Sequence, residues 1–178
     1  CIGDLPDLRK RDVEKLFRYR QAKGLPSNEG NPFYIKSAHL KEIDKFDHNY
    51  FNIPPRDAQV IDPSQRIFLE TAYQTIHDSS QGDCLRHSKT GLYIGFAARE
   101  KYYQFILSAK GTVEEDDVLG NRSALISSRL SYFLDLKGPA LVIDTTCSSG
   151  LVALHTACRA IQKGECEQAL VGSIKLTL

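Results

Sequence analysis

The residues best suited to chemistry lie between Ala140 and His155, where a single cysteine, Cys147, is flanked by small polar residues. A short apolar run precedes Asp-Thr-Thr, and Ser-Ser-Gly follows the cysteine before a second apolar run. The pattern predicts a strand, a tight turn and a helix that begins directly after the thiol. The free N–H groups and the dipole at a helix N-terminus favour a thiolate and can bind an oxyanion. The run therefore predicts a cysteine nucleophile on a strand–turn–helix elbow.

Cys147 also has a purely structural interpretation, since free cysteines are among the most buried residue types in proteins. The small polar residues on both sides of it favour the reactive thiol instead. The chain has an odd number of cysteines and no Cys-x-x-Cys pair; they are Cys1, Cys84, Cys147, Cys158 and Cys166. We therefore expect neither a disulfide framework nor a thiolate zinc site, and this cysteine usage is typical of a cytoplasmic protein.

Three other groups of residues could do chemistry, and each has a simpler interpretation. His155 follows Cys147 by eight residues, which is about 12 Å along a helix and too far for direct proton transfer. We expect it to be a packed core histidine, and a cysteine protease is the least favoured function. Glu114–Asp117 predicts a solvated acidic turn, with a metal site as the alternative. Val13, Leu16 and Phe17 have helical spacing and predict a short amphipathic helix between positions 9 and 23. Its basic residues are expected to form a solvated face, with docking to an acidic partner as the alternative.

The elements that must hold the elbow follow from apolar periodicity and from turn residues. Asp62 suits a helix N-cap and Pro63 suits the first helical position, so a helix is expected from there to residues 77–80. Further helices are expected at 97–111, 121–133 and 148–162, strands at 90–96, 140–144, 168–172 and 174–178, a packed irregular segment at 42–55, and loops at 24–32 and 81–89. Strands that alternate with helices indicate an α/β fold with a largely parallel sheet.

Composition narrows the class of protein. The chain has 178 residues, 25% of them charged, and a net charge of +1, which is ordinary for one globular domain and favours neither nucleic acid nor a membrane as a partner. No apolar run approaches the roughly 20 residues that span a bilayer. The sequence contains no Met and no recognisable signal peptide, so we expect it to begin inside a longer polypeptide.

The elbow resembles the active-site motif of the β-ketoacyl synthases, specifically the ketosynthase domains of modular polyketide synthases. Their pattern is Asp-Thr-Ala-Cys-Ser-Ser-Ser, and Asp144–Gly150 matches it at five of seven positions. The segment Ala169–Gly172 resembles the family's Ala-Leu-Ala-Gly-Gly. Other segments that resemble family motifs, in the family's order, are Phe46-Asp47, Tyr50–Ile53, Pro55-Arg56, Asp62–Arg66, Leu69-Glu70, Arg129–Tyr132, Gly138-Pro139 and Gly164–Cys166. The resemblance covers about residues 30–178.

The resemblance implies an α/β, thiolase-like fold with a mostly parallel sheet and helices on both faces. Residues 1–178 would form an incomplete ketosynthase domain, the first half of a double-layered αβαβα fold. Within it, 1–65 would be a surface and irregular lead-in and 66–178 part of the N-terminal thiolase-like half. We expect the chain to start after the family's first strand and helix and to stop about halfway through the domain. An uncovered apolar face and open strand edges then predict aggregation unless a partner covers them.

The resemblance also implies that Cys147 accepts an acyl chain from the phosphopantetheine of an acyl carrier protein, with its own backbone N–H as an oxyanion donor. A malonyl-type extender is then decarboxylated and condensed with that chain. No bound cofactor and no metal are implied. Thr146 replaces the usual Ala and is expected to contact the acyl chain, while Gly150 replaces a Ser and is expected to allow close backbone packing. The strand at 140–144 is expected to pair with its twin in a homodimer.

Two family motifs carry the histidines that decarboxylation requires, His-Gly-Thr-Gly-Thr and Lys-x-x-x-Gly-His, and neither occurs in this sequence. Three functions therefore stay open. The chain is the acyl-accepting part of a condensing ketosynthase, or part of a non-elongating ketosynthase that only transfers acyl chains. The third is an inactive fragment that serves dimerisation or docking within a multidomain synthase.

Overall fold

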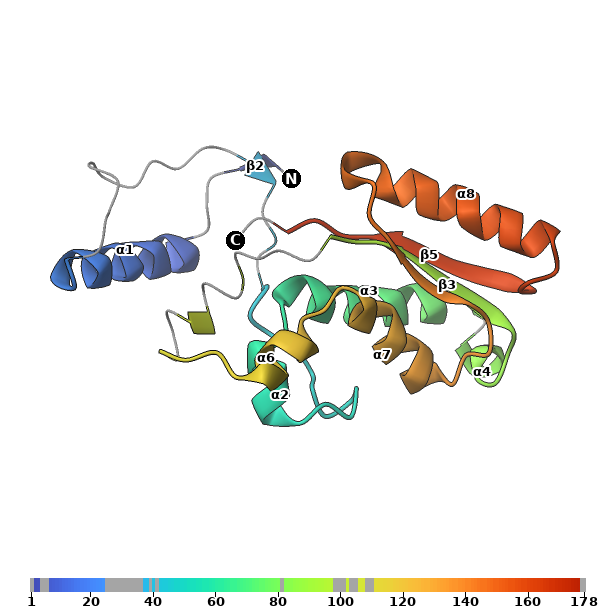
Figure 1. Cartoon of the computed structure of the whole chain (residues 1–178), viewed down its shortest axis with the longest axis horizontal. Helices are drawn as coiled ribbons and strands as arrows, with labels where there is room; N and C mark the ends of the chain where they lie inside the picture. The colour runs from blue at the N-terminus through green and yellow to red at the C-terminus, as the bar shows by residue number, and fades with distance from the viewer. Residues whose placement is uncertain are drawn as a thin grey trace. The chain divides into compact units, whose positions relative to one another are not determined.

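The computed structural model describes residues 2–3, 7–24, 37–38, 40, 42–80, 82–97, 102, 106–107 and 111–176. The chain divides into two compact units, Cys1–Ile43 and Asp44–Leu178. Figure 1 shows the elements of both units along the chain. Each unit is described by itself below, and the site lies in the second.

The first unit contains one long helix and a minimal pair of strands. Helix α1 (Asp7–Ala22) confirms the helix expected between positions 9 and 23. Of the three apolar residues that predicted its buried stripe, Val13 and Leu16 are exposed and Phe17 is half-buried. Strand β1 (Ile2–Gly3) pairs antiparallel with β2 (Ser37–Ala38). The loop expected at 24–32 lies, apart from Gly24, outside the described residues.

A parallel three-stranded sheet forms the centre of the second unit. Its order is β4 (Ala140–Ile143), β3 (Thr90–Gly95) and β5 (Gln168–Ser173), with β3 in the middle. In register, Gly95 at the end of β3 lies opposite Ile143 on one side and Ser173 on the other. The carboxyl ends of the three strands therefore meet at one edge of the sheet, which is where connecting turns can place functional groups together.

Helices cover both faces of this sheet, as Figure 1 shows. Strand β3 is buried along its whole length, and its side chains alternate between the two faces. Tyr93 packs on one face with alanines of α8 (Ser149–Gln162). Leu92 and Ile94 pack on the other face with α3 (Pro63–Asp78) and α7 (Ala124–Leu134). The expected α/β fold with a parallel sheet and helices on both faces is confirmed.

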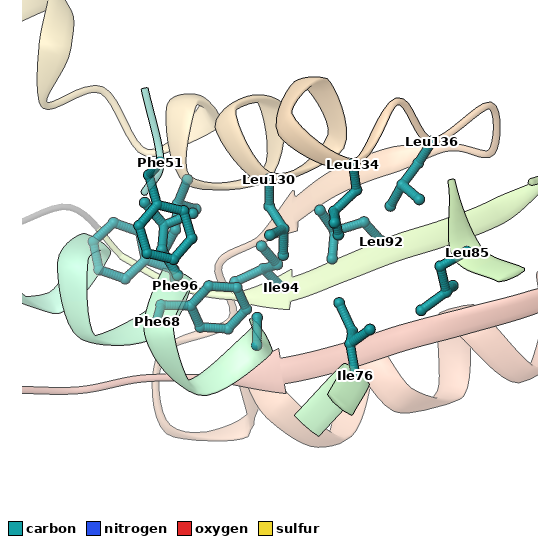
Figure 2. Packing of buried hydrophobic residues seen from close by; sticks show 13 residues of the cluster. Phe51, Phe68, Ile76, Leu85, Leu92, Ile94, Phe96, Leu130, Leu134 and Leu136 are labelled. Carbon is teal, nitrogen blue, oxygen red and sulfur yellow. The ribbon is translucent and has the colours of Figure 1, made fainter. Parts of the chain in front are cut away.

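The larger core lies between the sheet and helices α3 and α7. In Figure 2, Phe68 and Ile76 of α3 and Leu130 and Leu134 of α7 surround Ile94. The irregular segment expected at 42–55 also packs here through its aromatic rings, with Phe46 stacked on Phe51 at 5.3 Å and Phe51 against Phe133 at 5.2 Å.

The start of α3 follows from the two residues that predicted it. The Asp62 carboxylate accepts the Ser64 N–H at 2.7 Å, and Pro63 occupies the first helical position, where its missing N–H costs no hydrogen bond.

Asn121 holds this helix end to two other helices. Its amide oxygen accepts the Asp62 N–H at 2.7 Å, and its amide nitrogen donates to Val60 O at 2.7 Å and to Asp117 O at 2.9 Å.

Several expectations for local structure were wrong. Glu114–Asp117 is not a solvated turn: it begins helix α6 (Glu115–Gly120) through a capping box in which Asp117 is buried. Because Asn121 ends α6, the helix expected from 121 begins at Ala124 instead. Short helices α2 (Pro55–Val60) and α4 (Gly82–Leu85) were not expected.

Two further expectations concern the segments that flank β3 and follow β5. Residues 174–176 form no strand, although the Ile174 N–H still donates to Gly95 O at 3.3 Å, and 177–178 lie outside the described residues. Most of the helix expected at 97–111 also lies outside them. Its described members Tyr102 and Ile106 are buried against Val60.

Replacing Asn121 by Ala tests whether its amide joins α2, α3 and α6. Asn121→Ala leaves buried backbone groups without partners, so we expect the free energy of unfolding in urea to fall by about 2 kcal/mol. Ser128→Ala is the control, because the exposed Ser128 hydroxyl only bonds within its own helix, and we expect a change within about 0.5 kcal/mol. Equal effects of the two substitutions would contradict this role of Asn121.

Candidate functional site: the cysteine elbow

The elbow connects β4 to α8 at the edge of the sheet where the strands end. After Ile143 the chain forms a 3-10 turn, η1 (Thr146–Ser148), and α8 begins at Ser149. The expected sequence of strand, turn and helix is confirmed, with the helix beginning one residue later than expected. Cys147 lies in the middle of the 3-10 turn with an exposed side chain. The structure therefore contradicts the purely structural interpretation, in which Cys147 only packs in the core.

The residue before the cysteine has an unusual backbone. Thr146 has φ 57°, the left-handed region, which β-branched residues rarely adopt. Such a conformation costs about 1–3 kcal/mol and persists only where surrounding contacts impose it. One such contact is local, because the Thr146 N–H donates to the Asp144 carboxylate at 3.0 Å. Functional sites are where strain of this kind is commonly found.

The Ser149 hydroxyl makes two more contacts with the turn. It accepts the Thr145 N–H at 2.9 Å and donates to Thr146 O at 2.7 Å. Ser149 is only 6% exposed, whereas Ser148 beside it is exposed and bonds to Thr145 O at 2.8 Å. Sequence reasoning missed the contributions of Asp144 and Ser149, although Asp two residues before Thr146 has the spacing of an Asx turn.

Two glycines allow the first turn of α8 to lie against the strand ends. A Cβ atom on Gly95 would lie 2.7 Å from Gly150 N and 3.0 Å from the Ser149 Cβ atom. A Cβ atom on Gly150 would lie 2.7 Å from Ser173 Oγ. Close backbone packing was expected at Gly150, whereas the atoms that a side chain there would meet belong to the Ser173 side chain at the end of β5.

The inner face of α8 fixes the rest of the helix on the sheet. Ala153, Ala157 and Ala160 pack on Tyr93 and Cys166. Burial, with Cys166 beside it, raises the pKa of Tyr93 to about 12. The Tyr93 hydroxyl therefore stays neutral under the helix at physiological pH.

His155 does not pack in the core. It is exposed, because the small alanines of α8 form the inner face and His155 lies outside that stripe. Other described histidines have partners elsewhere: His48 Nδ1 lies 3.1 Å from Ile53 O, and His87 Nδ1 lies 2.5 Å from an Asp135 carboxylate oxygen. No described histidine contact supplies Cys147 with a base, and His39 lies outside the described residues.

The metal site considered as an alternative at Glu114–Asp117 is not assembled in the described part of the chain. There, no three His, Cys, Asp or Glu side chains gather in a way that could hold a metal ion. Cys84, Cys147, Cys158 and Cys166 are free thiols. None of the helices among the described residues combines the length and the apolar character needed to cross a membrane.

Comparison with known proteins identifies the family. The family profile described as "Beta-ketoacyl synthase, N-terminal domain" matches residues 1–178. Polyketide synthase PksM of Bacillus subtilis (strain 168) is 39% identical over 179 residues, which is 100% of this chain and 4% of that protein. Erythronolide synthase EryA2 of Saccharopolyspora erythraea is 37% identical over 150 residues, which is 84% of this chain and 4% of that protein.

Solved structures agree with this result. The ketosynthase from module 6 of the bacillaene synthase of Bacillus subtilis 168 matches with a TM-score of 0.67 and 40% identity, over 79% of this chain and 23% of that chain. The oxazolomycin ketosynthase domain OzmH KS7 of Streptomyces albus JA3453 matches with a TM-score of 0.64 and 32% identity, over 78% of this chain and 24% of that chain. The chain therefore belongs to the β-ketoacyl synthase family of transferases, among the ketosynthase domains of polyketide synthases.

The chain spans a small part of these relatives, under a quarter of the solved ketosynthase chains and 4% of the two multidomain synthases. Membership of the family is shown, whereas the roles of Cys147 and Thr146 and the division of the domain at residues 65 and 66 stay predictions.

The contact between Gly150 and Ser173 predicts a coupled pair of substitutions. The family pattern has Ser where this chain has Gly150 and a second Gly where it has Ser173. Gly150→Ser alone should lower the free energy of unfolding by about 1 kcal/mol, because the new side chain overpacks against Ser173. In a Ser173→Gly background the same substitution should be neutral or stabilising. Urea unfolding of the four proteins measures the coupling, and strictly additive effects would show that the two residues do not compete for space.

Proposed function

We propose that Cys147 is the acyl-accepting nucleophile of a ketosynthase domain of which residues 1–178 form part. The Cys147 thiolate attacks the carbonyl carbon of a thioester carried on the phosphopantetheine of an acyl carrier protein. A new bond forms between Sγ and the acyl carbon, the carrier's own C–S bond breaks, and the carrier thiol leaves after taking up a proton. The observation that carries the proposal is an exposed thiol on a strained turn at the start of α8, in a chain of this family.

The surroundings of Cys147 support further roles. We propose its backbone N–H as one donor to the oxyanion that forms during attack, because it lies at the start of a helix whose first N–H groups have no helical acceptor. Thr146 is proposed to contact the acyl chain, since it is exposed and directly precedes Cys147. The substrates bring their own phosphopantetheine, so no resident cofactor or metal is proposed.

Condensation is proposed for the complete domain. A malonyl-type extender would lose CO₂, and the resulting carbanion would attack the acyl group on Cys147 and release its thiol. This step needs the two family histidines, whose motifs do not occur in these 178 residues. A non-elongating ketosynthase, which transfers acyl chains without condensation, is the alternative that uses only the proposed role of Cys147.

One observation favours a non-catalytic contribution as a second candidate. Strand β4 is an edge strand of the described sheet, and Leu141 on it is 45% exposed. An open edge with an exposed apolar side chain can pair with a second copy. We propose that residues 140–144 pair in a homodimer within a cytoplasmic multidomain synthase.

Intact mass measurement tests the acyl transfer directly. Incubation of the full chain with hexanoyl-pantetheine should add one hexanoyl group, and Cys147→Ala should abolish the addition because it removes the proposed acceptor. Cys158→Ala is the matched control, since Cys158 is an exposed free thiol on α8, and it should be acylated as the unsubstituted chain is. Acylation of Cys147→Ala at the unsubstituted rate, or no acylation of the unsubstituted chain, would contradict the proposal.

A further inference from the structure

Ser149 differs from every other residue of the elbow in its burial. From Asp144 to Ser148 the side chains are exposed, whereas Ser149 is 6% exposed and makes two hydrogen bonds to the turn. A buried hydroxyl with both bonds made is held in place, because moving it would leave polar groups without partners.

The two bonds of Ser149 lie on either side of one peptide unit. Its oxygen accepts the N–H of Thr145 and its hydroxyl donates to the carbonyl of Thr146. These contacts fix the backbone of the residue before Cys147, the same residue whose φ is 57°. The Asp144 carboxylate holds the Thr146 N–H as well, but it is exposed and competes with water.

Ser149 also connects the turn to the sheet. Its Cβ atom lies 3.0 Å from the position that a Cβ atom on Gly95 would take, so the serine is in close contact with the end of β3. Ser149 therefore links the turn that carries the thiol to the end of the central strand.

From this geometry we infer that Ser149 is a positioning residue for Cys147, which holds the strained backbone at Thr146 so that the thiol is presented for acyl transfer. The inference rests on the acyl-accepting role proposed for Cys147. It assigns Ser149 no contact with the substrate. Its effect is on the orientation of the nucleophile, and misplacement by about 1 Å can cost on the order of 100-fold in rate.

The neighbouring serine provides a matched control. Ser148 lies beside the same cysteine, and its hydroxyl bonds to Thr145 O at 2.8 Å and Thr145 Oγ1 at 2.9 Å, but it is exposed. Ser149→Ala and Ser148→Ala each remove one hydroxyl oxygen next to Cys147. Only the first removes the contacts that span the Thr145–Thr146 peptide.

The experiment compares acylation by hexanoyl-pantetheine and alkylation by iodoacetamide in the full chain and its variants. Peptide mass mapping separates Cys147 from Cys158, which serves as an internal reference in each molecule. We expect Ser149→Ala to slow acylation at least tenfold and to lower the Cys147 to Cys158 alkylation ratio. Ser148→Ala should stay within about twofold of the unsubstituted chain, and the rate at Cys158 should not change in any variant.

A second variant separates positioning from general stability. Glycine adopts the left-handed region freely, so in a Thr146→Gly background the loss of the Ser149 hydroxyl should slow acylation less than in the unsubstituted chain. If Ser149→Ala does not fold, as a changed Cys158 rate would report, Ser149→Thr replaces it, and retention of the hydroxyl should keep acylation within about threefold.

The outcomes distinguish the two proposals. If the unsubstituted chain is not acylated, the acyl-accepting role fails, and the alkylation ratio still tests the positioning role. If the chain is acylated but Ser149→Ala and Ser148→Ala behave alike, or if Thr146→Gly leaves the effect of Ser149→Ala undiminished, the positioning role is overturned.

Discussion

Helix α8 begins in direct contact with the end of strand β3, where Gly95 leaves no side chain between helix and sheet. The rest of the elbow depends on this close approach. It places Ser149 under the turn, brings Gly150 against Ser173 on the neighbouring strand, and leaves Cys147 at the surface. A single methyl group at position 95 would push the helix away from the strand, because interiors this closely packed absorb added volume poorly.

The second constraint is the strained backbone before the cysteine. Thr146 donates its N–H to the Asp144 carboxylate and accepts the Ser149 hydroxyl at its carbonyl, and these two bonds hold it in a left-handed conformation that threonine rarely adopts. Free energy from packing α8 on the sheet through Ala153, Ala157 and Ala160 offsets this local cost. The stable part of the fold thus holds an unfavourable local geometry directly before Cys147, the proposed nucleophile.

The elements nearest the site could be predicted from the sequence. Apolar runs of the right length predicted the bounds of β3, β4, β5 and α8 to within one or two residues. The Asp62-Pro63 pair predicted the start of α3. What the sequence could not supply were contacts between residues distant in the chain. Nothing local marks Asn121 as the residue that joins three helices, or Ser173 as the neighbour of Gly150.

Two predictions of burial made from the local sequence were wrong. Glu114–Asp117 looked like a solvated turn, but a capping box turns the same carboxylates into a helix start and buries Asp117. His155 was expected to pack in the core because it lies too far along the helix to act on Cys147, whereas the alanine stripe of α8 faces the sheet and leaves His155 exposed. A capping box decided the first case, and the position of His155 outside the alanine stripe decided the second.

Two exposed thiols on one short segment allow the central claim to be tested without any substitution. Cys147 lies on the elbow and Cys158 lies further along α8, and both are free and exposed. The account predicts that time-resolved peptide mapping of the unsubstituted chain with an acyl-pantetheine thioester finds the acyl group on Cys147 at least ten times faster than on Cys158. Equal rates at the two thiols would contradict the claim that the elbow makes Cys147 an acyl acceptor.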